Sequence, residues 1–209
     1  MARGRLIAVE GIDGAGKSTQ TTRLAEALRR AGLDVVITRE PTGGPHGQEI
    51  RRRAAAGERL PADRELELFL RDRDEHIRGV IGPALAAGRT VVTDRYFLST
   101  AAYQGARLGD PEALLRRCEA RFPIPDLALV LVAPTEVGLR RVGLRGEARE
   151  AFEEEASLGD VARAFASLER PWIVRVDATG SPGEVHRRLV DAVAARLGLP
   201  VASVPGAGD

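Results

Sequence analysis

Short apolar runs alternate along the chain with longer segments in which apolar residues recur every three or four positions. The runs are rich in Val, Ile and Leu, which is typical of strands buried on both faces of a parallel sheet. The longer segments have the period of amphipathic helices. The predicted strands span residues 6–9, 34–38, 90–93, 127–132 and 173–176.

Helices are predicted between these strands. The longest begins at Pro61 and ends at Gly88, with apolar residues at helical spacing throughout. The others span residues 19–30, 48–56, 98–107, 111–121, 134–142, 158–169 and 182–197. This alternation predicts an α/β fold, a doubly wound five-stranded parallel sheet with helices on both faces. Such sheets bind ligands at the carboxyl ends of their strands, so the loops at that edge are the candidates for chemistry.

The length of 209 residues fits one domain. The domain is predicted to span residues 1–199, with a lid at about 140–156. Residues 200–209 are small and polar, which predicts a loose tail.

Composition narrows the function classes. A net charge of +1 provides no overall basic field of the kind that drives nucleic-acid binding. No apolar run approaches the ~20 residues of a membrane helix, and Met1 leads into a strand rather than a signal-peptide core. The single cysteine, Cys118, suits a reducing compartment. These features predict a cytoplasmic protein that binds neither nucleic acid nor membrane.

A glycine-rich loop joins the first predicted strand to the first helix. Its Gly, four residues, Gly, Lys, Ser pattern is that of a phosphate loop. In such loops backbone N–H groups point at phosphate oxygens, the lysine reaches the β- and γ-phosphates, and the serine hydroxyl binds Mg²⁺. The predicted nucleotide-binding residues are Gly11, Asp13, Gly14, Ala15, Gly16, Lys17, Ser18 and Thr19.

The alternative is a glycine-rich turn that binds nothing. Lys17 argues against it, because it is the only lysine among the 31 Lys and Arg residues. The lysine ammonium group is a compact point charge, whereas the arginine guanidinium group is planar and wider. The single lysine therefore stands at the position where a phosphate loop needs a compact charge. The pattern therefore favours nucleotide binding, with Lys17 as a catalytic residue.

Charged residues follow the second and third predicted strands. Arg39 can grip a phosphate with its planar fork, although a surface salt bridge is the commoner fate of such an arginine. Asp94 ends an apolar strand in a chain with a phosphate loop, which is where these folds place a second magnesium determinant. Arg95 is adjacent and is predicted to lie near the transferred phosphate.

Helical spacing supplies further candidates. Phe69 and Arg73 share one face of the long helix, where they can stack on a base and donate to its carbonyl. The alternative is a core phenylalanine beside an arginine paired with Asp72, Asp74 or Glu75. On the next helix, polar residues that line a pocket or face solvent recur at the same spacing: Ser99 with Tyr103, and Thr100 with Gln104.

An arginine-rich segment spans residues 140–155. It contains arginines at 140, 141, 145 and 149, and glycines at 143 and 146. One interpretation is a charged surface loop with compensating ion pairs. The other is a mobile lid that delivers an arginine to a phosphoryl-transfer transition state.

Taken in order, these segments resemble the thymidylate kinase family, over about residues 6–185. A phosphate loop alone indicates only a superfamily, whereas several spaced segments indicate a family. The segments are EGIDGAGKSTQ at 10–20, TREP at 38–41, LFLRDRDEH at 68–76, DRYFLSTAAYQ at 94–104, PD at 125–126, PTEVGLRR at 134–141 and VDA at 176–178. The resemblance implies transfer of a phosphoryl group from ATP to dTMP, a P-loop kinase fold with a short lid, and a homodimer.

The resemblance also implies roles for residues at the acceptor site. Asp13 would meet the sugar hydroxyl of dTMP, and Arg39 and Arg95 would hold its phosphate. Ser18 and Asp94 would organise Mg²⁺. The residues implied for the base are Phe69 for stacking, Arg73 for a carbonyl, Thr100 and Gln104 for hydrogen bonds, and Tyr103 for exclusion of a ribose 2′-hydroxyl.

Members of this family carry the catalytic arginine either in the phosphate loop or in the lid. This chain has Ala15 in the loop, so it is similar to the lid type, with Arg145 favoured and Arg141 and Arg149 next. The chain departs from common family patterns at Val132, Gly143 and Ser167 and in the REPTGGP segment at 39–45.

Three other functions compete with this interpretation. A regulatory GTPase reads guanine through an Asn-Lys-x-Asp segment, and this chain has no asparagine and no second lysine. A deoxynucleoside kinase has less use for two arginines that grip a phosphate, and an assay of thymidine against dTMP separates the two. A non-catalytic ATP-binding protein is the third alternative.

Overall fold

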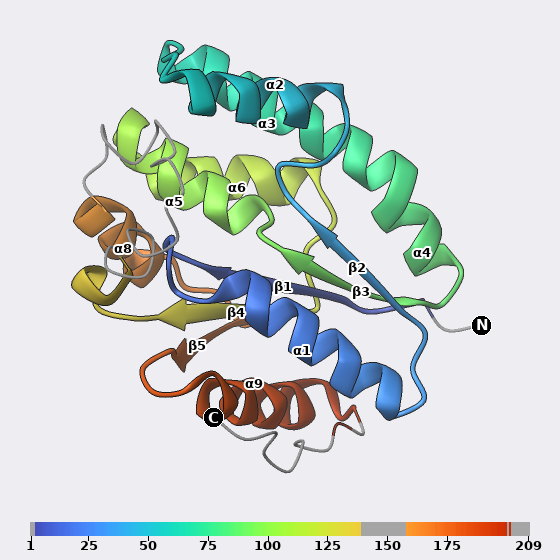
Figure 1. The fold of residues 1–209 in the computed structure, drawn as a ribbon. Helices are drawn as coiled ribbons and strands as arrows, with labels where there is room; N and C mark the ends of the chain where they lie inside the picture. Colours follow the sequence, from blue (N-terminus) through green and yellow to red (C-terminus); the bar gives the residue numbers. More distant parts are fainter. Residues whose placement is uncertain (1–2, 139–157, 200, 202–209) are drawn as a thin grey trace.

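A five-stranded parallel sheet forms the centre of the computed structural model, which describes residues 3–138, 158–199 and 201 (Figure 1). Its strand order is β2-β3-β1-β4-β5, and every neighbouring pair is parallel. The strands are β1 (Leu6–Gly11), β2 (Val35–Arg39), β3 (Thr90–Asp94), β4 (Leu127–Val132) and β5 (Ile173–Asp177). The predicted fold class is confirmed.

The strand order places a switch point between β1 and β3. From β1 the chain crosses to β2 on one side, whereas from β3 it crosses to β4 on the other. The carboxyl ends of these adjacent strands therefore open onto a shared crevice, which is where ligands bind in doubly wound sheets. All residues of β1 and β3 are buried, so the two strands that flank this crevice lie in the core.

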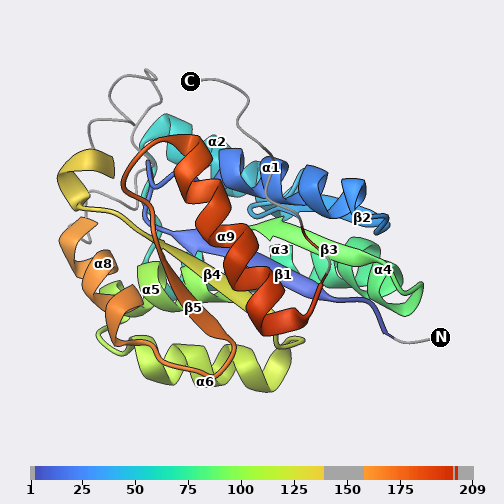
Figure 2. The same cartoon turned by 90° about the horizontal axis from the view of Figure 1, so that it is seen from below.

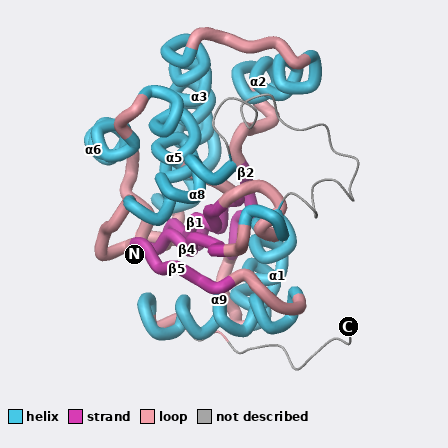
Figure 3. Tube along the Cα trace, turned by 90° about the vertical axis from the view of Figure 1, so that its left-hand side faces the viewer, coloured by secondary structure: helices cyan, strands magenta, loops and turns pink. Residues whose placement is uncertain are grey.

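Helices cover both faces of the sheet (Figure 2). On one face lie α1 (Lys17–Arg30) and α9 (Pro182–Leu197), which pack against each other. On the other lies α5 (Phe97–Leu108), flanked by α6 (Pro111–Arg121) and α8 (Leu158–Ser167). Outside α5 lies α3 (Ala62–His76), with α2 (Pro45–Ala56) packed on it, as the end view shows (Figure 3).

The long helix predicted from Pro61 to Gly88 is interrupted. After α3 comes a π-helical turn (η1, Ile77–Ile81) and then a short helix, α4 (Gly82–Ala86). Proline inside an α-helix clashes with the carbonyl four residues earlier and lacks an N–H. After the wider π turn, α4 begins at Gly82. Pro83 therefore lies in the first turn of α4, where the missing N–H is tolerated.

The predicted bounds of α9 are confirmed, because Ser181 and Glu184 form a reciprocal capping box at its start. Of the helix predicted at 134–142, residues 135–138 are helical. The predicted lid at 140–156 and tail at 200–209 lie almost wholly outside the described residues. No helix in the described ranges has the length and apolarity to cross a membrane.

Candidate active site

The phosphate loop leaves β1 and turns sharply into α1. Gly16 is the N-cap of α1, with φ of 99° in the left-handed region, and it has no side chain that could cap the first turn. Gly14 also has a positive φ, of 76°, and a Cβ there would lie 2.2 Å from the carbonyl oxygen of Gly138. Both positions therefore require glycine. The uncapped N–H groups at the start of α1 make this loop suited to an anion.

Lys17 is the first residue of α1 and is only 6% exposed. Its Nζ donates to the carbonyl oxygen of Ile12 at 2.8 Å and to Asp13 Oδ1 at 3.1 Å. These bonds fold the ammonium group back over the loop. The ammonium group therefore lies against the phosphate loop, and its contact with nucleotide phosphates stays a prediction.

Ser18 and Asp94 meet across the crevice between β1 and β3. The Ser18 hydroxyl donates to Asp94 Oδ2 at 2.5 Å. Asp94 Oδ1 is buried and has no hydrogen-bond partner in the part of the chain that the structure describes. A hydroxyl and a carboxylate with a spare oxygen fit the preference of Mg²⁺ for oxygen ligands. Nucleotide phosphates and water would supply the remaining ligands.

Asp13 connects the phosphate loop to Arg95. Its Oδ1 accepts from Lys17 Nζ and also from Arg95 Nη2. The Arg95 guanidinium lies over the ring of Tyr103, 5.1 Å from its centroid. One carboxylate oxygen therefore contacts both the predicted nucleotide lysine and the predicted acceptor arginine, so the two predicted subsites adjoin.

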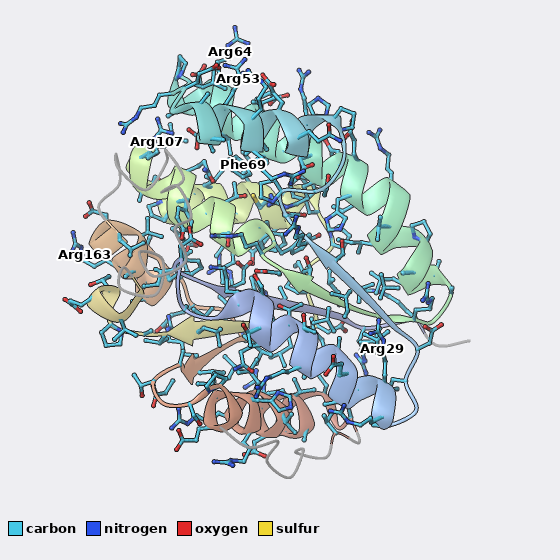
Figure 4. All side chains as sticks on the ribbon, in the orientation of Figure 1. Arg29, Arg53, Arg64, Phe69, Arg107 and Arg163 are labelled. Carbon is cyan, nitrogen blue, oxygen red and sulfur yellow. The ribbon has the colours of Figure 1, made fainter. Side chains whose placement is uncertain are left out.

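A pocket opens beside Arg95, between α3 and α5. Figure 4 labels Phe69 on the α3 side of this region. The lining of the pocket consists of Glu40, Pro41, Phe69, Arg95, Ser99, Tyr103 and Gln104.

Arg73 lies behind this pocket and is only 1% exposed. Its Nε and Nη2 donate to Glu40 Oε2 at 2.9 and 2.6 Å, and Nη2 also donates to Thr100 Oγ1 at 2.9 Å. The partner is therefore Glu40, from the loop after β2, rather than an acidic neighbour on α3. Nη1 is buried without a partner among the described residues, so one donor of the guanidinium is unsatisfied.

Glu40 is itself held from the other side. Its Oε1 bonds to His76 Nδ1 at 2.9 Å, and His76 Nε2 bonds to Thr38 Oγ1 at 2.6 Å. Burial raises the pKa of Glu40, but the Arg73 charge and the His76 hydrogen bond outweigh it and hold that pKa below its ordinary value. An ionised Glu40 thus fixes the Arg73 guanidinium. The sequence analysis did not identify Glu40 or His76 as residues that hold Arg73, although His76 shares a helix face with Arg73.

The other predicted substrate residues differ in their exposure and in their hydrogen-bond partners. Arg39 ends β2, is exposed and has no ion pair to any described residue. Thr100 accepts from Arg73, and Gln104 Nε2 donates to Glu65 Oε1 at 2.9 Å. The Tyr103 hydroxyl is buried and unpartnered within the described ranges. Their assignment to a ligand stays a prediction.

Glu10 was not among the predicted site residues. It is fully buried near the end of β1, where its carboxylate accepts from Tyr96 N at 3.0 Å and from the Ser99 hydroxyl. A charged residue inside the apolar run before a phosphate loop is the signal that could have identified it. Burial raises its pKa from 4.5 to about 7, against the opposing effects of the Ser99 hydrogen bond and the Arg95 charge.

This raised pKa predicts a pH dependence of stability. Between pH 4.5 and about 7 the folded state binds more protons than the unfolded state, so the free energy of unfolding should fall as pH rises. The loss should be about 3 kcal/mol across that window and then level off. Urea unfolding of wild type and Glu10→Gln from pH 5 to 8 measures it. As pH rises, the variant should become more stable relative to the wild type. A difference in the free energy of unfolding that stays constant with pH contradicts the prediction.

The predicted catalytic arginines Arg141, Arg145 and Arg149 lie outside the described residues. Of the positions where the chain departs from family patterns, Val132 is 48% exposed at the end of β4. Ser167 ends α8, and its hydroxyl donates to the carbonyl oxygen of Ala164 at 2.9 Å. Gly143 is among the residues not described.

Comparison with known proteins points to one family. The thymidylate kinase family model matches residues 9–189. The chain is 46% identical to the thymidylate kinase of Akkermansia muciniphila over 93% of this chain and 94% of the relative. It is 48% identical to that of Desulfotalea psychrophila, over 90% and 93%, and 47% identical to that of Xanthomonas oryzae pv. oryzae, over 93% and 86%. The chain belongs to the thymidylate kinase family.

Proposed function

We propose that this protein transfers the γ-phosphoryl group of ATP to dTMP, giving dTDP and ADP for deoxythymidine nucleotide biosynthesis. The observation that carries the proposal is the junction at Asp13, whose Oδ1 accepts from both Lys17 and Arg95. A phosphate loop and an arginine-lined pocket that meet at one carboxylate suit two phosphates placed for in-line transfer.

The residues act through charge and position. Lys17 and the loop N–H groups hold the donor phosphates, and Arg95 draws the acceptor phosphate toward them. Ser18 and Asp94 would hold Mg²⁺, which neutralises charge on the donor phosphates when it is bound. Arg39, exposed at the end of β2, is free to approach the acceptor phosphate. Because negative charge spreads over the transferred group, these cations stabilise the transition state more than the ground state.

The pocket beside Arg95 is assigned to the thymine base and its sugar. Phe69 stacks on the ring, and Arg73 offers its spare Nη1 donor to a carbonyl. Thr100 and Gln104 are placed to complete the base-reading edge, and Ser99 and Tyr103 close the sugar side. Asp13 is placed to accept from the sugar hydroxyl.

Three further features complete the proposal. The segment at 140–156 is assigned the catalytic arginine that Ala15 does not supply, with Arg145 favoured over Arg141 and Arg149. A homodimer is expected from the family resemblance. A cytoplasmic location is expected from the single cysteine, Cys118, which is a buried free thiol.

A coupled assay for ADP release tests the proposed function. With ATP and Mg²⁺, dTMP should be turned over and thymidine should not. Turnover of thymidine without dTMP would instead identify a deoxynucleoside kinase. Nucleotide binding without ADP release on any acceptor would identify a non-catalytic protein.

Base selectivity is expected to follow from Arg73. Cytosine places an amino donor where thymine places a carbonyl, which would leave the buried Nη1 facing another donor. We therefore expect dTMP to be strongly preferred over dCMP and dGMP. Loss of only the methyl group should make dUMP poorer by roughly tenfold in kcat/KM. Comparable kcat/KM values for dTMP and dCMP would remove Arg73 from base recognition.

A further inference from the structure

The backbone at Arg95 adopts an uncommon conformation. Its φ is 68°, and it is the one non-glycine residue with positive φ in residues 3–138 and 158–199. Residues other than glycine rarely adopt this backbone conformation, and they do so only where surrounding groups stabilise it. Such residues concentrate at functional sites, so the groups that hold Arg95 bear on its function.

Three hydrogen bonds hold the two peptide units around Arg95. Its N–H donates to the carbonyl oxygen of Val9 at 3.0 Å, and its carbonyl oxygen accepts from Thr93 Oγ1 at 2.8 Å. The next N–H, that of Tyr96, donates to Glu10 Oε1 at 3.0 Å. The peptide on the carboxyl side of Arg95 thus depends on two side chains, Thr93 and Glu10.

The second oxygen of Glu10 reaches the first turn of α5. Glu10 Oε2 accepts from the Ser99 hydroxyl, and Ser99 Oγ is 3.5 Å from Arg95 Nη1. The N-cap of α5 is Tyr96, whose own side chain makes no capping bond. Glu10 therefore supplies, from the neighbouring strand, a capping acceptor that this helix start lacks.

We propose that Glu10 is a positioning residue for the acceptor site, which fixes the Arg95 backbone and the start of α5 so that the Arg95 guanidinium points at the acceptor phosphate. The inference rests on the proposed function, because dTMP is the ligand whose binding reports on Arg95. Glu10 acts here through hydrogen-bond geometry. Its carboxyl group can serve in either protonation state, since a protonated Oε2 can donate to Ser99 while Oε1 still accepts from Tyr96 N.

Two substitutions separate geometry from charge. Glu10→Gln removes the charge but keeps the length, one acceptor for Tyr96 N and one donor for Ser99 Oγ. Glu10→Asp keeps the charge but withdraws the carboxylate by about 1.5 Å, so it cannot reach both partners. If Glu10 served Arg95 as a counterion, the aspartate variant would be the better enzyme.

The test measures dTMP binding by calorimetry and steady-state KM for both substrates. Glu10→Asp should weaken dTMP binding and raise the KM for dTMP by about tenfold or more, because small displacements of a positioned group are costly. KM for ATP should stay within about twofold, and Glu10→Gln should stay within about threefold of wild type for dTMP. Better function in the aspartate than in the glutamine variant, or equal effects on both substrates, would overturn the proposal.

A double-mutant cycle shows whether Glu10 acts through Arg95. In an Arg95→Ala background, Glu10→Asp should change dTMP affinity by less than about twofold, since the group it positions is absent. Full additivity would overturn the proposal. If circular dichroism shows that Glu10→Asp does not fold, Thr93→Val is the second variant, because it removes the other side-chain bond to the peptide after Arg95. It should raise the KM for dTMP and leave the KM for ATP nearly unchanged. An unchanged KM for dTMP would overturn the proposal.

The proposed function and this inference fail in different ways. Wild-type protein that does not bind dTMP contradicts the proposed function. Wild-type protein that binds dTMP, with an aspartate variant that binds it equally well, contradicts the inference alone.

Discussion

Lys17→Ala is expected to lower kcat by at least about 10²-fold, equivalent to about 3 kcal/mol of barrier. Phosphoryl transfer depends mainly on positioning and charge neutralisation, and Lys17 Nζ is the cation that the phosphate loop itself contributes. The fold should be kept, because the two bonds that Nζ makes, to Ile12 O and Asp13 Oδ1, lie within the loop. Initial rates at saturating ATP and dTMP measure the effect.

Two controls sharpen this experiment. Arg64 is an exposed cation on α3 (Figure 4), and Arg64→Ala should leave kcat within about twofold of wild type. Lys17→Arg should lose most of the activity, because a planar fork does not fit where a compact ammonium group is only 6% exposed. A kcat near the wild-type value in Lys17→Ala would remove the phosphate loop from the mechanism.

Arg73→Ala is expected to damage both stability and dTMP binding. It would leave the Glu40 carboxyl group, whose side chain is 3% exposed, without its main partner, which typically costs about 3–5 kcal/mol. It would also remove the spare donor at Nη1 and so raise the KM for dTMP, with little change for ATP. Denaturant unfolding and steady-state kinetics measure the two effects.

A paired variant separates the two roles of Arg73. Arg73→Met combined with Glu40→Gln removes both charges and keeps an amide oxygen for His76 Nδ1. It should therefore recover much of the stability lost in Arg73→Ala, while the KM for dTMP stays high. Equal instability in the single and double variants, or equal effects on both KM values, would assign Arg73 to folding alone.

Much of the fold could be predicted from the sequence because its signals are local. Each strand is an apolar run, and each helix has its own apolar period. The bounds of α9 were predicted correctly because Ser181 and Glu184 lie within a few residues of the backbone groups they cap. The break at η1 was not predicted, since the apolar period continues across it while Pro83 disrupts the backbone.

The candidate site divides in the same way. The phosphate loop is contiguous, so Lys17, Ser18 and the glycines could be identified in one segment, and motif spacing added Asp94, Arg95, Phe69 and Arg73. The sequence by itself thus determined the family, the sheet and the residue types available for chemistry.

Only the tertiary structure decided how those residues are held. Arg73 pairs with Glu40, 33 positions away, rather than with an acid on its own helix, because the loop after β2 folds against α3. Glu10 reaches Tyr96 and Ser99 because β1 lies beside β3 in the sheet. Burial raises the energetic cost of an unpaired polar group, and burial is a property of the packed chain. The supporting residues of this site therefore emerge only when the strands and helices are assembled.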